Sequence, residues 1–344
     1  MSKSILNKTN KNMLYIRTDG NAEIGTGHVM RCLSIASNVR KSGTDCIFIT
    51  ADEEMKPLIN EQGFSVICLD SIWNDIDLET KIMEQLINEQ GIKKLLIDSY
   101  FVTPDYLSKL NKITYVIYID DLNSFIYPCS MLINYNIYAN NFNYPVWYPQ
   151  SKLILGPKYA PLRSEFHNLP LRRIHKCAES ILITTGGTDE NNITGQILKE
   201  ISHNSQLMQL KYHIVAGKLN KNVSTLNGFA DKYKNIIIHH DIKQMSELMQ
   251  RCDIAISAGG STLYELCACS VPTVVFSMAD NQQMAVSEFS KGYMMGCGDF
   301  REGNDVCIKK ISDSLLKLTD TLILRSKLSK KCWSLVNPPN PWLI

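Results

Sequence analysis

Residues 13–36 read MLYIRTDGNAEIGTGHVMRCLSIA, and this stretch sets the pattern for most of the chain. The run MLYIRT predicts a buried strand, because it is largely apolar and is followed by turn residues. After the turn GTGH, apolar side chains recur at the spacing of one helix face, as Val29, Cys32, Leu33 and Ala36. A strand, a glycine-rich turn and a helix in this order predict one β–α unit.

The same alternation continues along most of the chain. Strand-like runs in the first half are DCIFIT, FSVICL, KKLLID and TYVIYID, and those in the second half are SILITT, KYHIVAG, NIIIHH, CDIAISA and PTVVFS. A short run, KLILG, stands between the halves. Strands separated by helical patterns predict parallel sheets with helices on both faces.

Prolines and charges replace this periodicity between residues 140 and 177, and we place a hinge there. We therefore predict an α/β protein with two Rossmann-like domains, at 13–160 and 178–325. Their parallel sheets are expected to face each other across a cleft lined by the carboxyl ends of the strands. Helical spacing continues over 305–328, and we expect a C-terminal tail over 326–344 that closes with NPPNPWLI, which cannot continue a helix.

The composition excludes several classes of protein. Lysine and arginine number 36 against 34 acidic residues, so the net charge of +2 provides no large field to attract nucleic acid or an anionic membrane. The 11 cysteines are scattered without the spacing of a zinc site, which predicts reduced thiols in the cytoplasm and no bound metal. The polar first dozen residues resemble no export signal, and no apolar run approaches the length of a bilayer span.

The turn GTGH allows two structural interpretations. One is a dinucleotide fingerprint, since the next strand is followed by the acidic residues 52–53 at a suitable distance for a ribose contact. Residues 19–24 intervene between strand and turn, however, and Met30 replaces the third glycine, which disfavours the fingerprint. The other interpretation is a plain turn, in which the glycines supply the backbone conformation and His28 only opens the helix.

A plain turn accounts for the helix but not for His28. A histidine at a helix start lies at the positive end of the helix dipole, which favours the neutral imidazole, and a neutral imidazole can accept a proton. We therefore regard His28 as a candidate general base, with Asp19 across the turn as the side chain that orients it. One histidine on one loop leaves the structural and the catalytic interpretations both open.

A second glycine turn follows a buried strand in CDIAISAGGSTLYELCACSVPTVVF, residues 252–276. The pair Gly259 and Gly260 would let a ligand approach the backbone closely. Ser261 and Thr262 can cap the next helix, whose free amides suit a diphosphate. Glu265 lies one turn deeper, where its carboxylate completes a capping box or accepts hydrogen bonds from the two hydroxyls of a ribose.

A third turn, ITTGGTDENN, places Gly186 and Gly187 between a strand and a helix. A plain turn and a contact with UDP are both compatible with these glycines. The lysine of a Walker motif is missing from the pattern. The two turns therefore predict a domain that holds a nucleotide diphosphate passively rather than one that hydrolyses a triphosphate.

Six motifs in order carry a resemblance to a known family: IRTDGNAEIGTGHVMRCLSIA, IDSY, IDDL, LGPKYAPLRSEF, ITTGGTDENN and SAGGSTLYELCACSVPT. Over residues 14–281 the chain resembles the UDP-2,4-diacetamido-2,4,6-trideoxy-β-L-altropyranose hydrolases of pseudaminic acid biosynthesis. The resemblance implies a glycosyltransferase-B-like (GT-B-like) fold, with UDP held mainly by the C-terminal domain. It also implies hydrolysis at the anomeric carbon with inversion, without a metal or a cofactor.

The resemblance assigns roles to particular residues. The histidine of the GTGH motif activates water in this family, which implies the same role for His28 and makes Gly25, Thr26 and Gly27 the loop that meets the substrate. The resemblance places Glu265 on the ribose and the turn Gly259–Thr262 on the diphosphate.

Other matching positions have weaker parallels. Tyr100 in IDSY and Asn281 in MADNQQ match positions of the sugar pocket, although an ordinary surface tyrosine and a helix-capping asparagine are the alternatives. Arg163 and Glu165 of LGPKYAPLRSEF fall on the predicted hinge, where a structural role is also open.

Two other functions stay open. One is a transferase of the same fold that moves a sugar from UDP to an acceptor, and the other is a binding or regulatory protein that keeps the nucleotide site without catalysis. A transferase for lipid-linked acceptors calls for an apolar patch rimmed by basic residues, and the first 150 residues show no such cluster. The expected partner is a UDP-sugar, without nucleic acid or membrane; a monomer agrees with the sequence, and the oligomeric state stays open.

Overall fold

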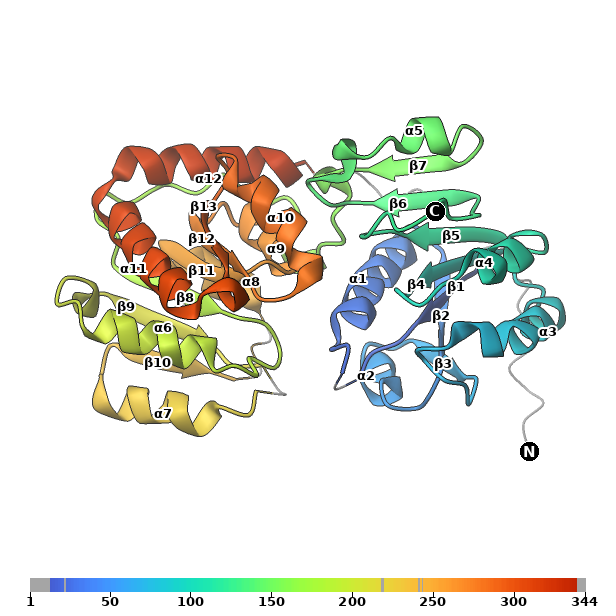
Figure 1. Ribbon diagram of the computed structural model, residues 1–344, viewed down its shortest axis with the longest axis horizontal. Helices are drawn as coiled ribbons and strands as arrows, with labels where there is room; N and C mark the ends of the chain where they lie inside the picture. The colour runs from blue at the N-terminus through green and yellow to red at the C-terminus, as the bar shows by residue number, and fades with distance from the viewer. Residues whose placement is uncertain (1–12, 22, 218–219, 241, 243, 339–344) are drawn as a thin grey trace. The chain divides into compact units, whose positions relative to one another are not determined.

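The computed structural model describes residues 13–338 except 22, 218–219, 241 and 243. The chain folds into two compact units (Figure 1): an N-terminal unit of residues 13–134 and 143–154, and a C-terminal unit of residues 135–142 and 155–338. The chain thus passes between the units after residues 134, 142 and 154 instead of once between 160 and 178. Residues 135–142 belong to the C-terminal unit, where Asn136 accepts a 3.1 Å hydrogen bond from Tyr264.

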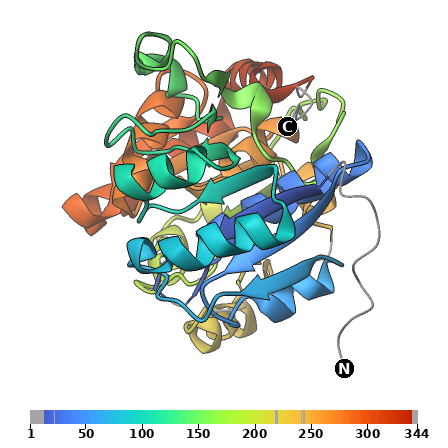
Figure 2. The same ribbon diagram turned by 90° about the vertical axis from the view of Figure 1, so that its right-hand side faces the viewer.

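The N-terminal unit contains a seven-stranded sheet in the order β3–β2–β1–β4–β5–β6–β7, parallel from β3 to β6. Right-handed crossovers put α1 and α2 on one face and α3 and α4 on the other, and Figure 2 shows the second pair in front of the sheet. The strands are β1 Met13–Thr18, β2 Asp45–Thr50, β3 Ser65–Cys68, β4 Lys94–Asp98, β5 Tyr115–Ile119, β6 Met131–Asn134 and β7 Lys152–Leu155. The helices are α1 Gly27–Lys41, α2 Lys56–Glu61, α3 Thr80–Gln90, α4 Pro104–Asn111 and α5 Tyr144–Trp147.

The C-terminal unit contains a six-stranded parallel sheet in the order β10–β9–β8–β11–β12–β13. Its strands are β8 Ser180–Thr184, β9 Lys211–Val215, β10 Ile236–His239, β11 Ile254–Ala258, β12 Thr273–Ser277 and β13 Met295–Asp299. Its helices are α6 Ile193–Ser202, α7 Val223–Lys232, α8 Met245–Arg251, α9 Thr262–Ala268, α10 Asp280–Ser290, α11 Asn304–Asp320 and α12 Leu322–Val336. The predicted plan of two α/β units with parallel sheets is confirmed.

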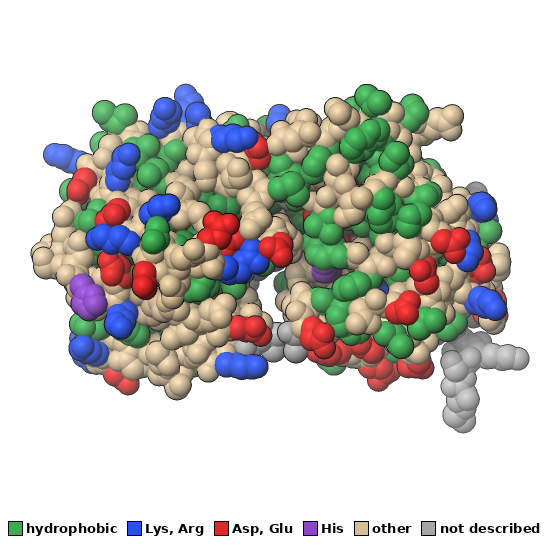
Figure 3. All heavy atoms as spheres, in the orientation of Figure 1, with side chains coloured by type: hydrophobic (Ala, Val, Ile, Leu, Met, Phe, Trp, Pro, Cys, Tyr) green, Lys and Arg blue, Asp and Glu red, His purple; other side chains and the backbone are tan. Residues whose placement is uncertain are grey.

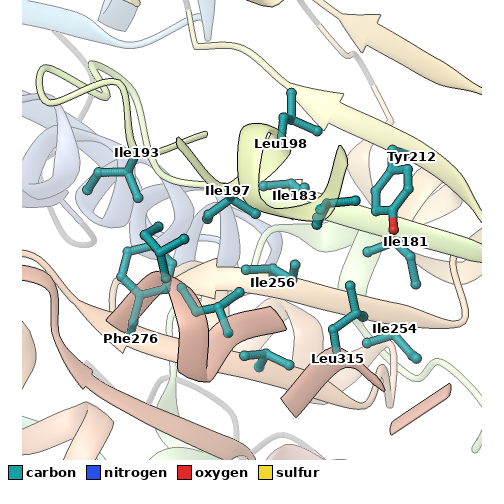
Figure 4. Packing of buried hydrophobic residues seen from close by; sticks show 14 of the residues in the cluster. Ile181, Ile183, Ile193, Ile197, Leu198, Tyr212, Ile254, Ile256, Phe276 and Leu315 are labelled. Carbon is teal, nitrogen blue, oxygen red and sulfur yellow. The ribbon is translucent and has the colours of Figure 1, made fainter. Parts of the chain in front are cut away.

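The core of the C-terminal unit explains why its strands read as continuous apolar runs. Buried isoleucines of β8 and β11 pack against α6 and α11 on one face of the sheet, as Figure 4 shows for Ile181, Ile183, Ile254, Ile256, Ile197 and Leu315. A strand in the middle of a parallel sheet is covered by helices on both faces, so it has no solvent-facing side that would favour polar residues. These strands therefore place the loops that follow them rigidly.

The prediction of a tail from residue 326 is wrong as far as Val336, because α12 covers Leu322–Val336. Arg325 anchors this helix. Its buried guanidinium donates hydrogen bonds of 2.6–2.9 Å to the carbonyl oxygens of Leu318, Thr319, His175 and Lys176. The last part of the predicted tail, residues 339–344, lies outside the described residues.

The edge of the C-terminal sheet carries a histidine pair that makes stability depend on pH. Nδ1 of His213 lies 2.8 Å from Nε2 of His239, and burial, with the neighbouring charges of His239 and Lys211, lowers the pKa of His213 to about 4. The folded state thus favours neutral His213, whereas the unfolded chain binds a proton near pH 6.5. Stability from this pair is complete above that pH and is lost as the pH falls from about 6.5 towards 4.

We expect the urea midpoint to fall between pH 7.5 and pH 5, and His213→Gln to reduce that fall, because the variant has no imidazole to protonate. The exposed His203 provides the matched control, His203→Gln. An unchanged pH dependence in His213→Gln would contradict the assignment.

Candidate active site

The chain order of the N-terminal sheet reverses between β1 and β4, which are neighbours although two strands separate them in the sequence. In open α/β sheets, ligands bind in the crevice outside the carboxyl ends of the strands at such a switch point. The loop after β1 leads to His28, and β4 ends at Asp98. The two residues are therefore brought together by the topology.

His28 is the second residue of α1 and is 8% exposed. Its Nδ1 lies 2.7 Å from Oδ1 of Asp98, which is buried at the end of β4. A carboxylate can only accept a hydrogen bond, so this distance assigns the ring proton to Nδ1. Nε2 of His28 is then left with a free lone pair, as a proton acceptor needs.

Arg31 keeps Asp98 ionised. It stands one helical turn after His28 and donates from Nε to Oδ2 of Asp98 at 2.6 Å and from Nη2 to Oδ1 at 2.5 Å. Burial by itself raises the pKa of the Asp98 carboxyl, but the charges and hydrogen bonds of Arg31 and His28 outweigh burial and hold that pKa well below its ordinary value. The carboxylate beside His28 is therefore charged throughout the neutral range.

Tyr100 belongs to the same cluster, and its predicted place in the sugar pocket stays a prediction. Its ring meets that of His28 edge-on, with 4.4 Å between ring centroids and 77° between ring planes. Its hydroxyl donates to Oδ2 of Asp121 at 2.9 Å, and Arg31 donates to the same oxygen at 2.6 Å. The cluster is thus a continuous network from β4 through α1 to the end of β5.

Asp19 does not orient His28, so that prediction is corrected. Its Oδ1 accepts from the amide of Ala51 at 2.8 Å, and its Oδ2 pairs with Arg17 at 2.5 Å. The reason is the fully buried guanidinium of Arg17, which requires carboxylates around it and has Asp19 and Glu79. Burial raises the pKa of Asp19, against the charge of Arg17.

A small cavity connects these residues. Its open volume is about 200 Å³, and it is lined by Asp19, Ile24, His28, Trp73, Asp98, Ser99, Tyr100 and Phe101. Asp19 therefore borders the same space as His28 even though it does not contact the ring. The volume of about 200 Å³ includes space that is open to solvent.

The glycines of GTGH shape the turn. Gly25 has a φ of 72°, which favours glycine, and its carbonyl accepts a 3.2 Å bond from the amide of Asn21. Gly27 is the first residue of α1, and Thr26 is its N-cap residue. The side chain of Thr26 makes no capping hydrogen bond to the described part of the helix. The structure thus agrees with the turn interpretation for the glycines, while it gives His28 a carboxylate partner that a plain turn does not need.

The C-terminal sheet has its own switch point, between β8 and β11. Both predicted glycine turns follow these two strands: Gly186 and Gly187 come after β8, and Gly259 and Gly260 come after β11. Gly186 has a φ of 95° and is exposed, as is Gly187. Both predicted turns therefore lie at the carboxyl ends of the two strands that flank the switch point of this sheet.

Gly259 has a packing role that was not expected. A Cβ at this position would lie 2.5 Å from Cγ2 of Val286 on α10, so only glycine lets that helix approach. A Cβ on Gly260, in contrast, would point into open space. Of the two glycines, Gly260 is the one that leaves its backbone open to a ligand.

Helix α9 is only seven residues long, and some of the backbone amides at its start are hydrogen-bonded within the same turn. The amides of Gly260, Leu263 and Tyr264 donate to carbonyls of the same turn at 2.9–3.1 Å. Ser261 is the N-cap residue of α9, but within this described segment its side chain makes no capping hydrogen bond, contrary to the prediction. The amides of Ser261 and Thr262 are the donors that this turn can still offer to an anion.

Glu265 pairs with Arg163 instead of completing a capping box. Nε of Arg163 lies 2.9 Å from Oε1 of Glu265, and its Nη1 lies 2.9 Å from Oε1 of Glu165. Oε2 of Glu165 accepts a hydrogen bond of 2.9 Å from the amide of Ser246, which holds the Glu165 carboxylate in place. Burial raises the pKa of Glu265, against the charge of Arg163. Arg163 is thus a partner of the candidate ribose residue and not only a hinge residue.

Asn281 is the second residue of α10 and is exposed. The N-cap of α10 is Ala279, so Asn281 does not cap the helix. Its predicted place in the sugar pocket stays a prediction.

Three further observations on the described residues concern metal-ligating side chains, cysteines and long apolar helices. No group of three or more His, Cys, Asp or Glu side chains among them is arranged to hold a metal ion. All 11 cysteines are free thiols. None of the described helices combines the length and the apolar character that crossing a bilayer requires.

Comparisons with known proteins agree with this architecture. Residues 180–297 match the model of the glycosyltransferase family 28 C-terminal domain. The Acinetobacter baumannii MurG structure aligns with a TM-score of 0.65 at 15% identity, over 95% of this chain and 96% of that one. A UDP co-structure of S. aureus MnaA aligns with a TM-score of 0.66 at 9% identity, over 96% and 92%. The chain has a GT-B-like fold.

Relatives in sequence extend over most of the chain. An uncharacterized protein of Methanocaldococcus jannaschii, MJ1062, is 30% identical over 80% of this chain, which spans 58% of the length of that relative. The UDP-2,4-diacetamido-2,4,6-trideoxy-β-L-altropyranose hydrolase of Campylobacter jejuni is 26% identical over 80% of this chain and 96% of its own length.

Proposed function

We propose that this protein is an enzyme acting on a nucleotide sugar, and that it hydrolyses UDP-2,4-diacetamido-2,4,6-trideoxy-β-L-altropyranose to UDP and the free sugar of pseudaminic acid biosynthesis. The observation that carries the proposal is His28, a buried histidine fixed by an ionised carboxylate and bordering a small cavity. The name of the Campylobacter relative supports the choice of substrate.

In the proposed reaction, water attacks the anomeric carbon on the side opposite the leaving UDP. The water oxygen forms the new bond to carbon, and the bond from that carbon to the diphosphate oxygen breaks with its electron pair going to UDP. One water proton passes to Nε2 of His28, which later returns it to solvent. Attack opposite the leaving group inverts the configuration at the anomeric carbon.

A single base is sufficient for this substrate. Inverting glycosidases use two carboxylates because an alcohol leaves poorly without a proton, whereas a departing diphosphate can be stabilised by backbone amides. We place the diphosphate at the turn Gly259–Thr262, the ribose at Glu265, and Gly186 and Gly187 beside the nucleotide. The match of this region to the family 28 domain supports that placement.

The sugar contacts complete the proposal. Tyr100, which packs on His28, and Asn281 are proposed to contact the sugar, and Gly25, Thr26 and Gly27 to form the loop beside it.

Incubation of the purified protein with the UDP-sugar alone tests the reaction. Release of UDP with formation of the free sugar, followed by NMR so that the first anomer formed is seen, is the expected result. The match of residues 180–297 to a glycosyltransferase family 28 C-terminal domain also keeps a glycosyltransferase as the second candidate. UDP that is released only when an acceptor is added would favour that transferase over the hydrolase.

Glu265 offers a separate test of the nucleotide site. Glu265→Gln should weaken UDP binding by about 1–3 kcal/mol, the scale of a lost hydrogen bond to a charged group, as measured by calorimetry with UDP. Glu247→Gln, at an exposed carboxylate of the same unit, is the matched control. Equal UDP affinity in Glu265→Gln and in the control would remove Glu265 from the ribose site.

A further inference from the structure

Two aromatic side chains form one wall of the cavity beside His28. Trp73 lies in the loop after β3 and Phe101 in the loop after β4, and both line the cavity. Their rings meet edge to face, with 5.2 Å between centroids and 82° between planes. The proposed catalytic step gives neither of them a role.

This wall is held in place before any ligand arrives. The hydroxyl of Thr103 donates to Oδ1 of Asp77 at 2.7 Å, which ties the segment after Phe101 to the segment after Trp73. Ser71 is fixed twice, by a 2.8 Å bond from its hydroxyl to Glu79 and a 3.0 Å bond from its amide to Ala51. Preformed apolar walls are typical of small-molecule sites.

The wall also remains open to solvent. Phe101 is 36% exposed, and Trp73 is only partly buried. Large aromatic side chains stabilise most when their surface is buried, so a bound apolar group would gain from covering them. Figure 3 shows further hydrophobic side chains on one face of the N-terminal unit. Among the described residues, Trp73, Phe101 and Tyr100 are the aromatic side chains that border the cavity together with His28.

The substrate named for the Campylobacter relative supplies apolar groups that suit such a wall. A 2,4-diacetamido-2,4,6-trideoxy sugar carries a methyl group at C6 in place of a hydroxymethyl group, and each acetamido group ends in another methyl. These methyl groups are the least hydrated parts of the sugar. Contact with aromatic rings removes them from water.

We propose that Trp73 and Phe101 form the subsite for the methyl groups of the sugar and set the preference for 6-deoxy, acetamido sugars over sugars with a C6 hydroxyl. The inference rests on the proposed function and adds the residues that choose the sugar. A hydroxymethyl group placed against the wall would lose hydrogen bonds to water without a replacement. The wall thus discriminates by rejecting the hydroxyl as well as by holding the methyl.

The test compares Trp73→Ala and Phe101→Ala with Trp147→Ala, which removes an exposed tryptophan from α5, outside the cavity. The measured quantity is the ratio of kcat/KM for the 6-deoxy UDP-sugar to that for its analogue with a hydroxyl group at C6 and no other change. This ratio should fall tenfold or more in the cavity variants, a usual scale for one methyl group in an apolar pocket. UDP affinity, measured by calorimetry, should match that of wild type in all three variants.

A second measurement separates this inference from the proposed reaction. Saturation-transfer NMR on the His28→Ala background reports whether the methyl protons of the 6-deoxy UDP-sugar touch the protein, and Trp73→Ala should abolish that signal. If the methyl signal is observed but the wild-type protein does not hydrolyse the UDP-sugar, the subsite is supported and the proposed reaction is overturned. Hydrolysis with an unchanged kcat/KM ratio in both cavity variants would overturn the subsite and leave the reaction standing.

Discussion

His28→Ala should lower the rate of UDP release by about 10²–10⁴-fold, the usual contribution of a positioned general base. UDP affinity should stay at the wild-type value, because the residues proposed to bind UDP all belong to the C-terminal unit. A coupled assay for UDP gives the rate and calorimetry gives the affinity. Turnover above about a tenth of wild type would remove His28 from the mechanism.

Asp98→Asn tests the carboxylate of the His28–Asp98 pair. An amide in place of the carboxylate can donate to Nδ1 of His28, which would put the ring proton on Nε2 and block proton acceptance. We expect a loss approaching that of His28→Ala, although Arg31 then loses part of its counter-charge. Circular dichroism of the variant shows whether the fold survives, and His203→Ala serves as the control histidine.

Glu79→Gln should lower the free energy of unfolding by up to about 3–5 kcal/mol, the scale of breaking a buried ion pair, because among the described residues buried Arg17 keeps only Asp19 as a charged partner. Glu79 and Arg17 are both fully buried, and Arg17 donates to the two carboxylate oxygens of Glu79 at 2.7 and 2.8 Å. The hydroxyl of Tyr106 donates to the same carboxylate at 2.8 Å. Urea denaturation measures the change.

An exposed ion pair in the same unit supplies the comparison. Glu53 pairs with Lys56 on the surface, where solvent screens the charges, so Glu53→Gln should leave the urea midpoint nearly unchanged. Equal midpoints for Glu79→Gln and Glu53→Gln would show that the buried pair adds no more than the exposed one.

The strands were largely predictable because parallel strands buried on both faces leave a strong apolar signal. Two strands were missed. The strand β6, Met131–Asn134, is only four residues long, and β13, Met295–Asp299, reads MGCGD and lies at the edge of its sheet. Short or glycine-rich edge strands form because a neighbour offers hydrogen bonds, and that neighbour is invisible in a local sequence pattern.

The sequence predicted where the candidate histidine lies, but not which carboxylate is its hydrogen-bond partner. His28 was found from its place after a glycine turn, yet the sequence offered Asp19 as its partner because Asp19 is near in the chain. Asp98 is the actual partner because β4 lies next to β1, a fact of topology. An available signal was that buried strands end in an aspartate at both IDSY and IDDL, which supply Asp98 and Asp121.

The excursion of residues 135–142 into the C-terminal unit has a consequence for dissecting the protein. Neither unit is one continuous piece of sequence, so a single cut near residue 160 would not release an intact half. The N-terminal fragment would retain Asn136 and Ile137, whose hydrogen-bond partner Tyr264 would be on the other fragment. A chimaera that exchanges the C-terminal unit of this protein would therefore need to exchange residues 135–142 together with it.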